Sequence, residues 1–76
     1  MVELYSADQC IWSGKMKAHL DAAGIEYRSI NVAEPVNAEK LYSLTGQRGF
    51  PVTVIGDEII IGCDTKAVDK AIQNMR

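Results

Sequence analysis

The sequence has little cysteine, little basic charge and no long apolar run, and each shortage excludes a class of protein. Two cysteines and one histidine in 76 residues are too few for a secreted disulfide scaffold or a structural zinc site. The net charge of −2 and the scattered lysines argue against a nucleic-acid partner. No apolar run approaches the roughly 18 residues that cross a membrane. We therefore expect a cytoplasmic protein with neither nucleic-acid nor membrane partners.

The residues that are present have the balance of an ordinary globular protein, 47% hydrophobic and 24% charged. The chain shows no internal repeat, low-complexity tract or linker. We therefore expect residues 1–76 to form a single domain with a modest core, and a monomer.

Apolar spacing divides the chain into seven elements in the order βαβαββα. Gly56-Asp57 is typical of a hairpin turn, Asp64 is a natural N-cap for the last helix, and Leu41 and Leu44 are expected to face the core. The order predicts an α/β fold with one parallel strand pair and one antiparallel hairpin. The predicted strands are residues 2–6, 27–32, 52–55 and 58–61, and the predicted helices are residues 11–23, 36–45 and 65–75.

The segment Cys10-Ile11-Trp12-Ser13 places one thiol where the first strand gives way to the first helix. A helix N-terminus carries partial positive charge and unpaired N–H groups, so a cysteine there is held partly as the reactive thiolate. The spacing is that of the redox motif CxxC, but Ser13 replaces the second cysteine. An alcohol cannot form a disulfide, and the site must therefore use one sulfur.

Two further segments accompany this site along the chain. They are Gly49-Phe50-Pro51 and Gly62-Cys63-Asp64. The segment from Tyr5 to Ser13 is similar to the strand, loop and CPYC active site of glutaredoxins, with Ile11, Trp12 and Ser13 in the last three positions of that motif. Together the three segments resemble the signatures of glutaredoxins, members of the thioredoxin-like superfamily. The resemblance covers essentially the whole chain. It implies a four-stranded mixed sheet flanked by three helices.

The resemblance also implies a reaction with glutathione as co-substrate. The Cys10 thiolate would attack glutathionylated proteins or low-molecular-weight disulfides and take the glutathionyl group, which a second glutathione would then release. The protein would be a glutathione-dependent thiol-disulfide oxidoreductase with a monothiol mechanism. Its expected catalytic residues are Cys10 and Ser13, and no bound metal is expected.

The residues expected to bind glutathione also follow from the resemblance. A cis Pro51 would place the Phe50 backbone beside the cysteinyl group. The glycine-containing turn at Gly62 would present the Cys63 and Asp64 main-chain amides to the γ-glutamyl carboxylate, and the Asp64 side chain would meet its ammonium. Two more side chains, Gln47 and Arg48, would reach the glycine carboxylate, and Trp12 completes the expected set.

Two positions depart from the family pattern. Ala7 stands where glutaredoxins usually carry a lysine, so Arg48, Gln47 or Lys15 would have to compensate for the missing charge. Ser13 is either a natural hydrogen-bond partner of a single-thiol enzyme or an engineered replacement of cysteine. We favour engineering, because Trp12-Ser13 is unlike the CGFS motif of natural monothiol members.

Several of these residues also have simpler explanations. Cys63 is better explained as an inert small hydrophobe than as a second redox centre, with its backbone the functional part. His19 fits a surface or packing role better than that of a catalytic base. Trp12 either lines the glutathione groove or shields the helix start, and Lys15 either raises the local potential or is a solvated surface lysine.

Two alternative functions stay open at this point. Some glutaredoxins carry a [2Fe-2S] cluster ligated by two subunits and two glutathiones, which would use Cys10. A dithiol electron donor to a reductase is possible only if position 13 is natively cysteine.

Overall fold

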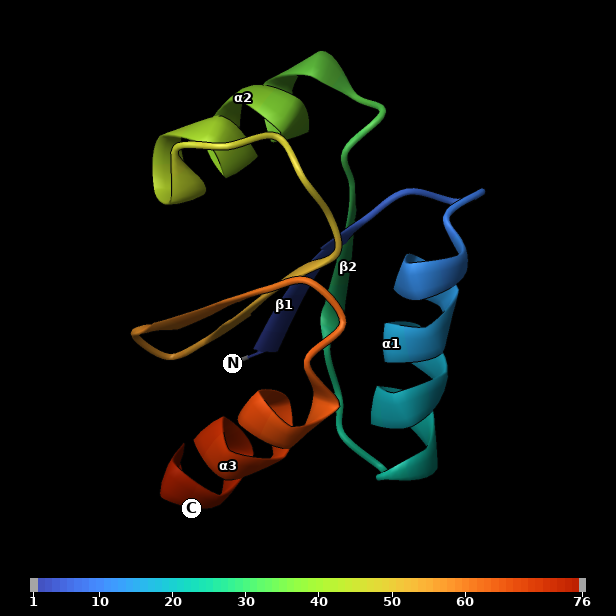
Figure 1. The fold of residues 1–76 in the computed structure, drawn as a ribbon, viewed down its shortest axis with the longest axis vertical. Helices are drawn as coiled ribbons and strands as arrows, with labels where there is room; N and C mark the ends of the chain where they lie inside the picture. Colours follow the sequence, from blue (N-terminus) through green and yellow to red (C-terminus); the bar gives the residue numbers. More distant parts are fainter. Residues whose placement is uncertain (1, 76) are drawn as a thin grey trace.

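The computed structural model describes residues 2–75 and confirms the predicted order of elements. No helix within that range is long and apolar enough to cross a membrane. Observed and predicted ends differ by at most one residue. The elements are β1 (Val2–Ser6), α1 (Ile11–Ala22), β2 (Arg28–Asn31), α2 (Pro35–Thr45), β3 (Val52–Ile55), β4 (Glu58–Ile61) and α3 (Thr65–Met75), as Figure 1 shows.

The four strands form one mixed sheet in the order β2-β1-β3-β4. β1 pairs with β2 in parallel, and the chain passes through α1 between them; β1–β3 and β3–β4 are antiparallel. Tyr5 lies opposite Ile30 on one side and Val52 on the other. The predicted parallel pair and hairpin are therefore both present, joined through the central β1–β3 pair.

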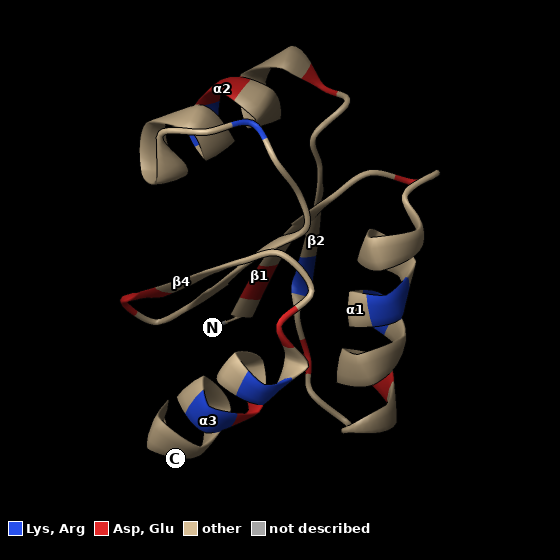
Figure 2. Ribbon diagram, in the orientation of Figure 1, with Lys and Arg blue, Asp and Glu red and all other residues tan. Residues whose placement is uncertain are grey.

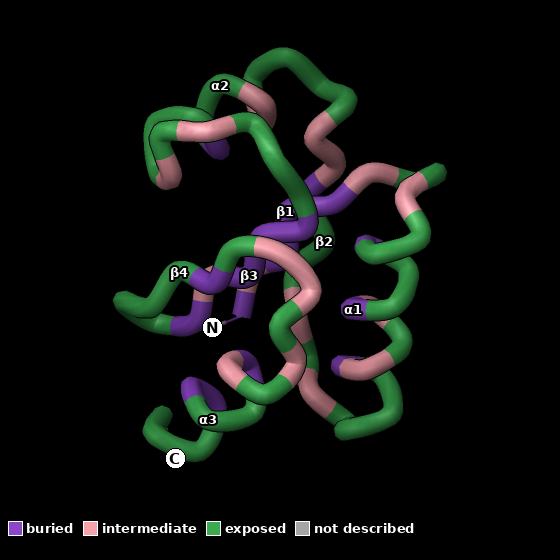
Figure 3. The backbone as a smooth tube through the Cα atoms, in the orientation of Figure 1, coloured by how far each residue is buried: buried purple, intermediate pink, exposed green. Residues whose placement is uncertain are grey.

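The helices cover the two faces of the sheet unequally. α1 and α3 pack on one face, over a cluster that Met16, Leu20 and Val68 share with Val2, Leu4 and Ile55 among others. On the other face α2 covers a smaller cluster. Figure 3 shows that most of α2 is exposed. The residues of the smaller cluster are Tyr5, Ile30, Leu41 and Val52.

The prediction that Leu44 faces the core is wrong. Its side chain is 40% exposed, and Leu41 is the buried residue of α2. The cluster that α2 covers is small, and Leu41 is the residue of this helix that belongs to it. Helical spacing identifies a possible inward stripe, but the size of the opposing surface decides how much of the stripe is buried.

The polarity of the strands brings three chain segments to one edge of the sheet. β1 and β4 end there, and β3 begins there, because Tyr5 pairs with Val52 and Val52 pairs with Ile61. α1 and α3 both start near this edge (Figure 1). The loops at these strand ends contain Cys10, Phe50-Pro51 and Gly62-Cys63-Asp64, which the sequence analysis predicts to be functional.

Candidate active site

Cys10 is the N-cap residue of α1. Its backbone is extended, with φ −94° and ψ 121°. The Cys10 carbonyl accepts the first helical hydrogen bond from Gly14 N–H at 3.0 Å, and the Cys10 N–H closes a turn onto the Ala7 carbonyl at 3.2 Å. The Cys10 side chain makes no N-cap bond of the kind that serine or aspartate makes. The N–H groups of the first turn are therefore free to stabilise a charged sulfur.

The surroundings of Cys10 lower the pKa of its thiol. The largest cause is a hydrogen bond to the sulfur from the Ser13 backbone N–H, followed by the Ser13 hydroxyl; the Trp12 N–H acts in the same direction. Partial burial opposes the shift by penalising the charged form, but it is outweighed. Both cysteines are free thiols and both are partly exposed. The predicted activation of Cys10 at a helix start is therefore present in the structure.

Ser13 is completely buried, at 0% exposure. Its hydroxyl accepts a hydrogen bond from the Ala7 N–H at 3.3 Å and also contributes to lowering the pKa of Cys10. One small side chain thus links the turn before the helix to the sulfur. A hydroxyl can act as donor and acceptor at once, which suits it to this position.

The peptide bond between Phe50 and Pro51 is cis, as the resemblance predicts. Pro51 is buried at the start of β3, whereas the Phe50 side chain is 39% exposed. Both residues border an open groove of about 330 Å³ that Trp12, Gly62 and Cys63 complete. Of the two explanations for Trp12, the structure favours lining of the groove, with the indole 56% exposed.

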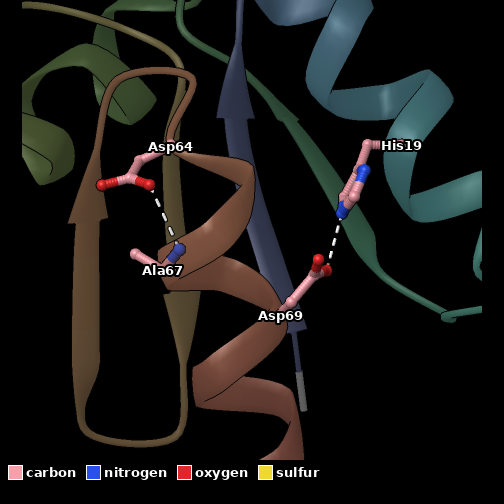
Figure 4. Close-up of polar contacts among 4 residues, drawn as sticks. All are labelled: His19, Asp64, Ala67 and Asp69. Carbon is pink, nitrogen blue, oxygen red and sulfur yellow. Dashed lines mark hydrogen bonds and ion pairs between the residues drawn. The ribbon is translucent and has the colours of Figure 1, made fainter.

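The turn after β4 is joined to the proline segment and to α3. Gly62 adopts φ +85°, a conformation that favours glycine, and donates its N–H to the Pro51 carbonyl at 2.8 Å. The Asp64 carboxylate caps α3 by accepting a hydrogen bond from the Ala67 N–H at 3.1 Å (Figure 4). The predicted N-cap is thus confirmed. Cys63 packs against the core beneath α1 and α3 and also lines the groove.

The side-chain amide of Gln47 forms hydrogen bonds within its own loop. Its Oε1 accepts from the Gly49 N–H at 2.6 Å, and its Nε2 donates to the Gly49 carbonyl at 3.2 Å. These two bonds fix the orientation of the amide, whose Nε2 carries a second N–H. The Arg48 guanidinium lies over the Tyr42 ring of α2, 5.1 Å from its centroid. The reach of both residues to glutathione stays a prediction.

A contact that the sequence analysis did not predict lies beside the groove. The Lys15 ammonium sits over the Trp12 ring, 4.5 Å from its centroid. The i, i+3 spacing was the available signal, because residues three apart are neighbours on a helix. Figure 2 shows basic residues on α1 and on the loop between α2 and β3.

His19 lies away from the groove and connects two helices. Its Nε2 is 2.6 Å from the Asp69 Oδ1 of α3 (Figure 4). Both side chains are partly exposed. This contact agrees with the predicted surface role. Among residues 2–75, no group of three histidine, cysteine or acidic residues is arranged to hold a metal ion.

A partly exposed thiol of lowered pKa at a helix start and a cis proline before β3, on a four-stranded sheet with three helices, define a thioredoxin-like redox protein. The glutaredoxin family model matches residues 2–60. A relative from Clostridium pasteurianum, an uncharacterized glutaredoxin-like 8.6 kDa protein in the rubredoxin operon, is 35% identical over 74 residues, covering 96% of this chain and 99% of the relative. The chain belongs to the glutaredoxin family.

Two solved structures show the same fold. The buckwheat glutaredoxin-glutathione complex is 27% identical with a TM-score of 0.76, and the match covers 97% of this chain and 74% of that one. The glutaredoxin-like NrdH-redoxin from Escherichia coli, described as having a thioredoxin-like activity profile, is 22% identical with a TM-score of 0.79; the match covers 91% of each chain. The second likeness is evidence of fold alone.

Proposed function

We propose that this protein is a glutathione-dependent thiol-disulfide oxidoreductase that works with Cys10 alone. The Cys10 thiolate attacks the glutathione sulfur of a mixed disulfide. A Cys10–glutathione disulfide forms, the original S–S bond breaks, and the substrate leaves as a thiolate that takes up a proton. A second glutathione thiolate then attacks the adduct, which releases oxidised glutathione and restores the Cys10 thiolate.

The observation that carries this proposal is the partly exposed Cys10 sulfur with a lowered pKa. The thiolate is the attacking form, and a low thiol pKa also makes Cys10 a good leaving group when the second glutathione attacks. Ser13 holds the position where a resolving thiol would compete with that second glutathione. A single-sulfur cycle therefore fits the chemistry of both positions.

The groove offers groups suited to a glutathione molecule. The Phe50 backbone before cis Pro51 would pair with the cysteinyl unit, and the Cys63 and Asp64 amides at the start of α3 would hold the γ-glutamyl carboxylate. Asp64 uses Oδ1 to cap α3, and its negative charge would attract the neighbouring ammonium. The similarity to the buckwheat glutaredoxin-glutathione complex supports this assignment. The proposed substrates are glutathionylated proteins and low-molecular-weight disulfides.

Mass measurement after incubation with oxidised glutathione tests the proposal. We expect one glutathione on the native protein, and peptide mapping should place it on Cys10. The adduct should disappear in Cys10→Ser and persist in the matched control Cys63→Ser. An adduct found only on Cys63, or no adduct at all, would contradict the assignment.

A thioredoxin-like activity with two thiols is the competing function, because the Escherichia coli neighbour is described as having a thioredoxin-like activity profile. It needs a second thiol, and the buried Ser13 occupies that position. We expect Ser13→Cys to form an intramolecular disulfide with Cys10 on oxidation, since the two positions share the first turn of α1. Turnover driven by a dithiol reductant should then be present in Ser13→Cys and absent in the native chain.

A further inference from the structure

The Lys15 ammonium lies against the ring of a residue that lines the groove, and it has no carboxylate partner among residues 2–75. Lys15 lies 4.5 Å above the Trp12 ring, and among residues 2–75 it forms no ion pair. Trp12 itself lines the groove beside Pro51 and Cys63. A lysine held on an aromatic ring loses part of its conformational freedom before any ligand arrives, which lowers the entropic cost of a later contact.

The other polar side chains expected to meet a substrate carboxylate contact residues that do not line the groove. Both ends of the Gln47 amide bind Gly49, and Arg48 lies over Tyr42 of α2. Among residues 2–75, Lys15 is the cation whose aromatic contact is with a groove-lining side chain. It therefore places a positive charge next to Trp12 at the groove.

We infer that Lys15, held on the indole of Trp12, selects disulfide substrates that carry a carboxylate close to their sulfur. This inference rests on the proposed function and adds a specificity-determining residue to it. The carboxylate has two possible sources. It belongs either to glutathione itself or to an acidic residue next to the cysteine of the glutathionylated partner.

The first arm of the test measures the rate of Cys10 adduct formation with oxidised glutathione and with the same disulfide after all its carboxylates are converted to amides. The ratio of the two rates removes any effect of Lys15 on the reactivity of the thiolate, since both substrates meet the same sulfur. Lys15→Gln should lower this ratio about three- to fivefold, the scale of an exposed charge pair. Lys15→Arg should preserve it.

Lys17→Gln is the matched control, because residue 17 is on the same helix but two positions further along, where it does not share the Trp12 face. It removes the same net charge and should leave the ratio unchanged. Trp12→Ala should lower the ratio as Lys15→Gln does, because the ring that holds the ammonium is lost.

The second arm uses glutathionylated peptides that differ only in Glu or Gln beside the cysteine. A lower Glu-to-Gln rate ratio in Lys15→Gln would identify the partner's side chain as the source, and a change confined to the first arm would identify glutathione. Equal ratios for Lys15→Gln and Lys17→Gln in both arms would overturn the inference but leave the proposed function standing. Failure of the native protein to form any Cys10 adduct would overturn both.

Discussion

The N-termini of α1 and α3 lie near the same edge of the sheet, and each has a cysteine beside it. The two helices differ in which group interacts with the N–H groups of their first turn. At α3 the Asp64 carboxylate accepts a hydrogen bond from the Ala67 N–H, and Cys63 lies outside the helix. At α1 the cysteine itself is the N-cap residue and makes no capping bond. The first-turn N–H of Ser13 therefore donates a hydrogen bond to the Cys10 sulfur.

This difference separates a structural helix start from a reactive one. The Asp64 carboxylate takes the Ala67 N–H in the first turn of α3 and places a negative charge there, which disfavours a thiolate beside it. The start of α1 keeps those groups for a negative charge on sulfur, and the buried Ser13 hydroxyl adds to them. Position relative to the first helical turn, rather than the presence of cysteine, distinguishes Cys10 from Cys63.

Replacing each cysteine in turn should give the largest difference in turnover between the two helix starts. Cys10→Ser should reduce turnover of a glutathionylated peptide to the uncatalysed background, because no other group supplies the attacking thiolate. Cys63→Ser should stay within about twofold of native turnover, since replacement of a side chain that attacks nothing leaves the thiolate in place. A glutathione-coupled turnover assay checks both. Comparable losses in the two variants would contradict the distinction.

Removing the Ser13 hydroxyl should make the start of α1 less favourable to the thiolate. Ser13→Ala should raise the pKa of Cys10, and adduct formation at mildly acidic pH should slow because the thiolate fraction falls. The partly buried Ala7 N–H loses its acceptor as well, which should lower the free energy of unfolding by about 1 kcal/mol. Ultraviolet thiolate titration and urea unfolding measure the two effects. An unchanged Cys10 pKa would show that the hydroxyl is not needed.

Two substitutions at Asp64 separate its role as the cap of α3 from the role of its negative charge. Asp64→Ala should lower the free energy of unfolding by about 1 kcal/mol through loss of the cap. Asp64→Asn should retain most of that stability, because asparagine caps equally well, but should weaken glutathione binding through loss of the charge. Urea unfolding and the dependence of turnover on glutathione concentration separate these roles. Equal loss of stability in both variants would rule out capping by the neutral amide.

The lowered pKa of Cys10 should also make stability depend on pH. A thiol whose folded pKa is depressed contributes stability that is fully present above the unfolded pKa and is lost as pH falls through the folded pKa. The difference in free energy of unfolding between native protein and Cys10→Ala should therefore increase with pH across that window. Urea unfolding at several pH values under reducing conditions measures it. A difference that does not vary with pH would contradict the shift.

The contact between His19 and Asp69 should have the smallest effect. Both side chains are partly exposed, so His19→Ala should lower the free energy of unfolding by about 0.5 kcal/mol or less. Turnover should not change, because the pair lies away from the groove. Asp69→Ala is the matched variant and should give the same small loss. A large loss of turnover in either would give the pair a role that its position does not suggest.

The sequence predicted the elements well because local signals agreed with one another. The Gly56-Asp57 turn, the Asp64 cap and the position of Cys10 each depend on a few neighbouring residues. The burial of Leu44 was mispredicted because it depends on the area of the surface beneath α2, which no local pattern encodes.

The site was predicted in part for the same reason. The cis bond before Pro51 was predicted from the resemblance to glutaredoxins, and the activation of Cys10 from its position at a helix start. The closure of Gln47 onto Gly49 depends on side-chain rotamers that many loop sequences allow. The contact of Lys15 with Trp12 required knowledge that the indole would remain exposed rather than enter the core.

Ultraviolet titration of the Cys63→Ser protein, in which Cys10 is the sole thiol, measures directly whether the start of α1 stabilises the Cys10 thiolate. We expect the thiolate to appear at a pH clearly below the ordinary cysteine value of about 8.5. A midpoint at or above that value would show that the start of α1 does not stabilise the charged sulfur.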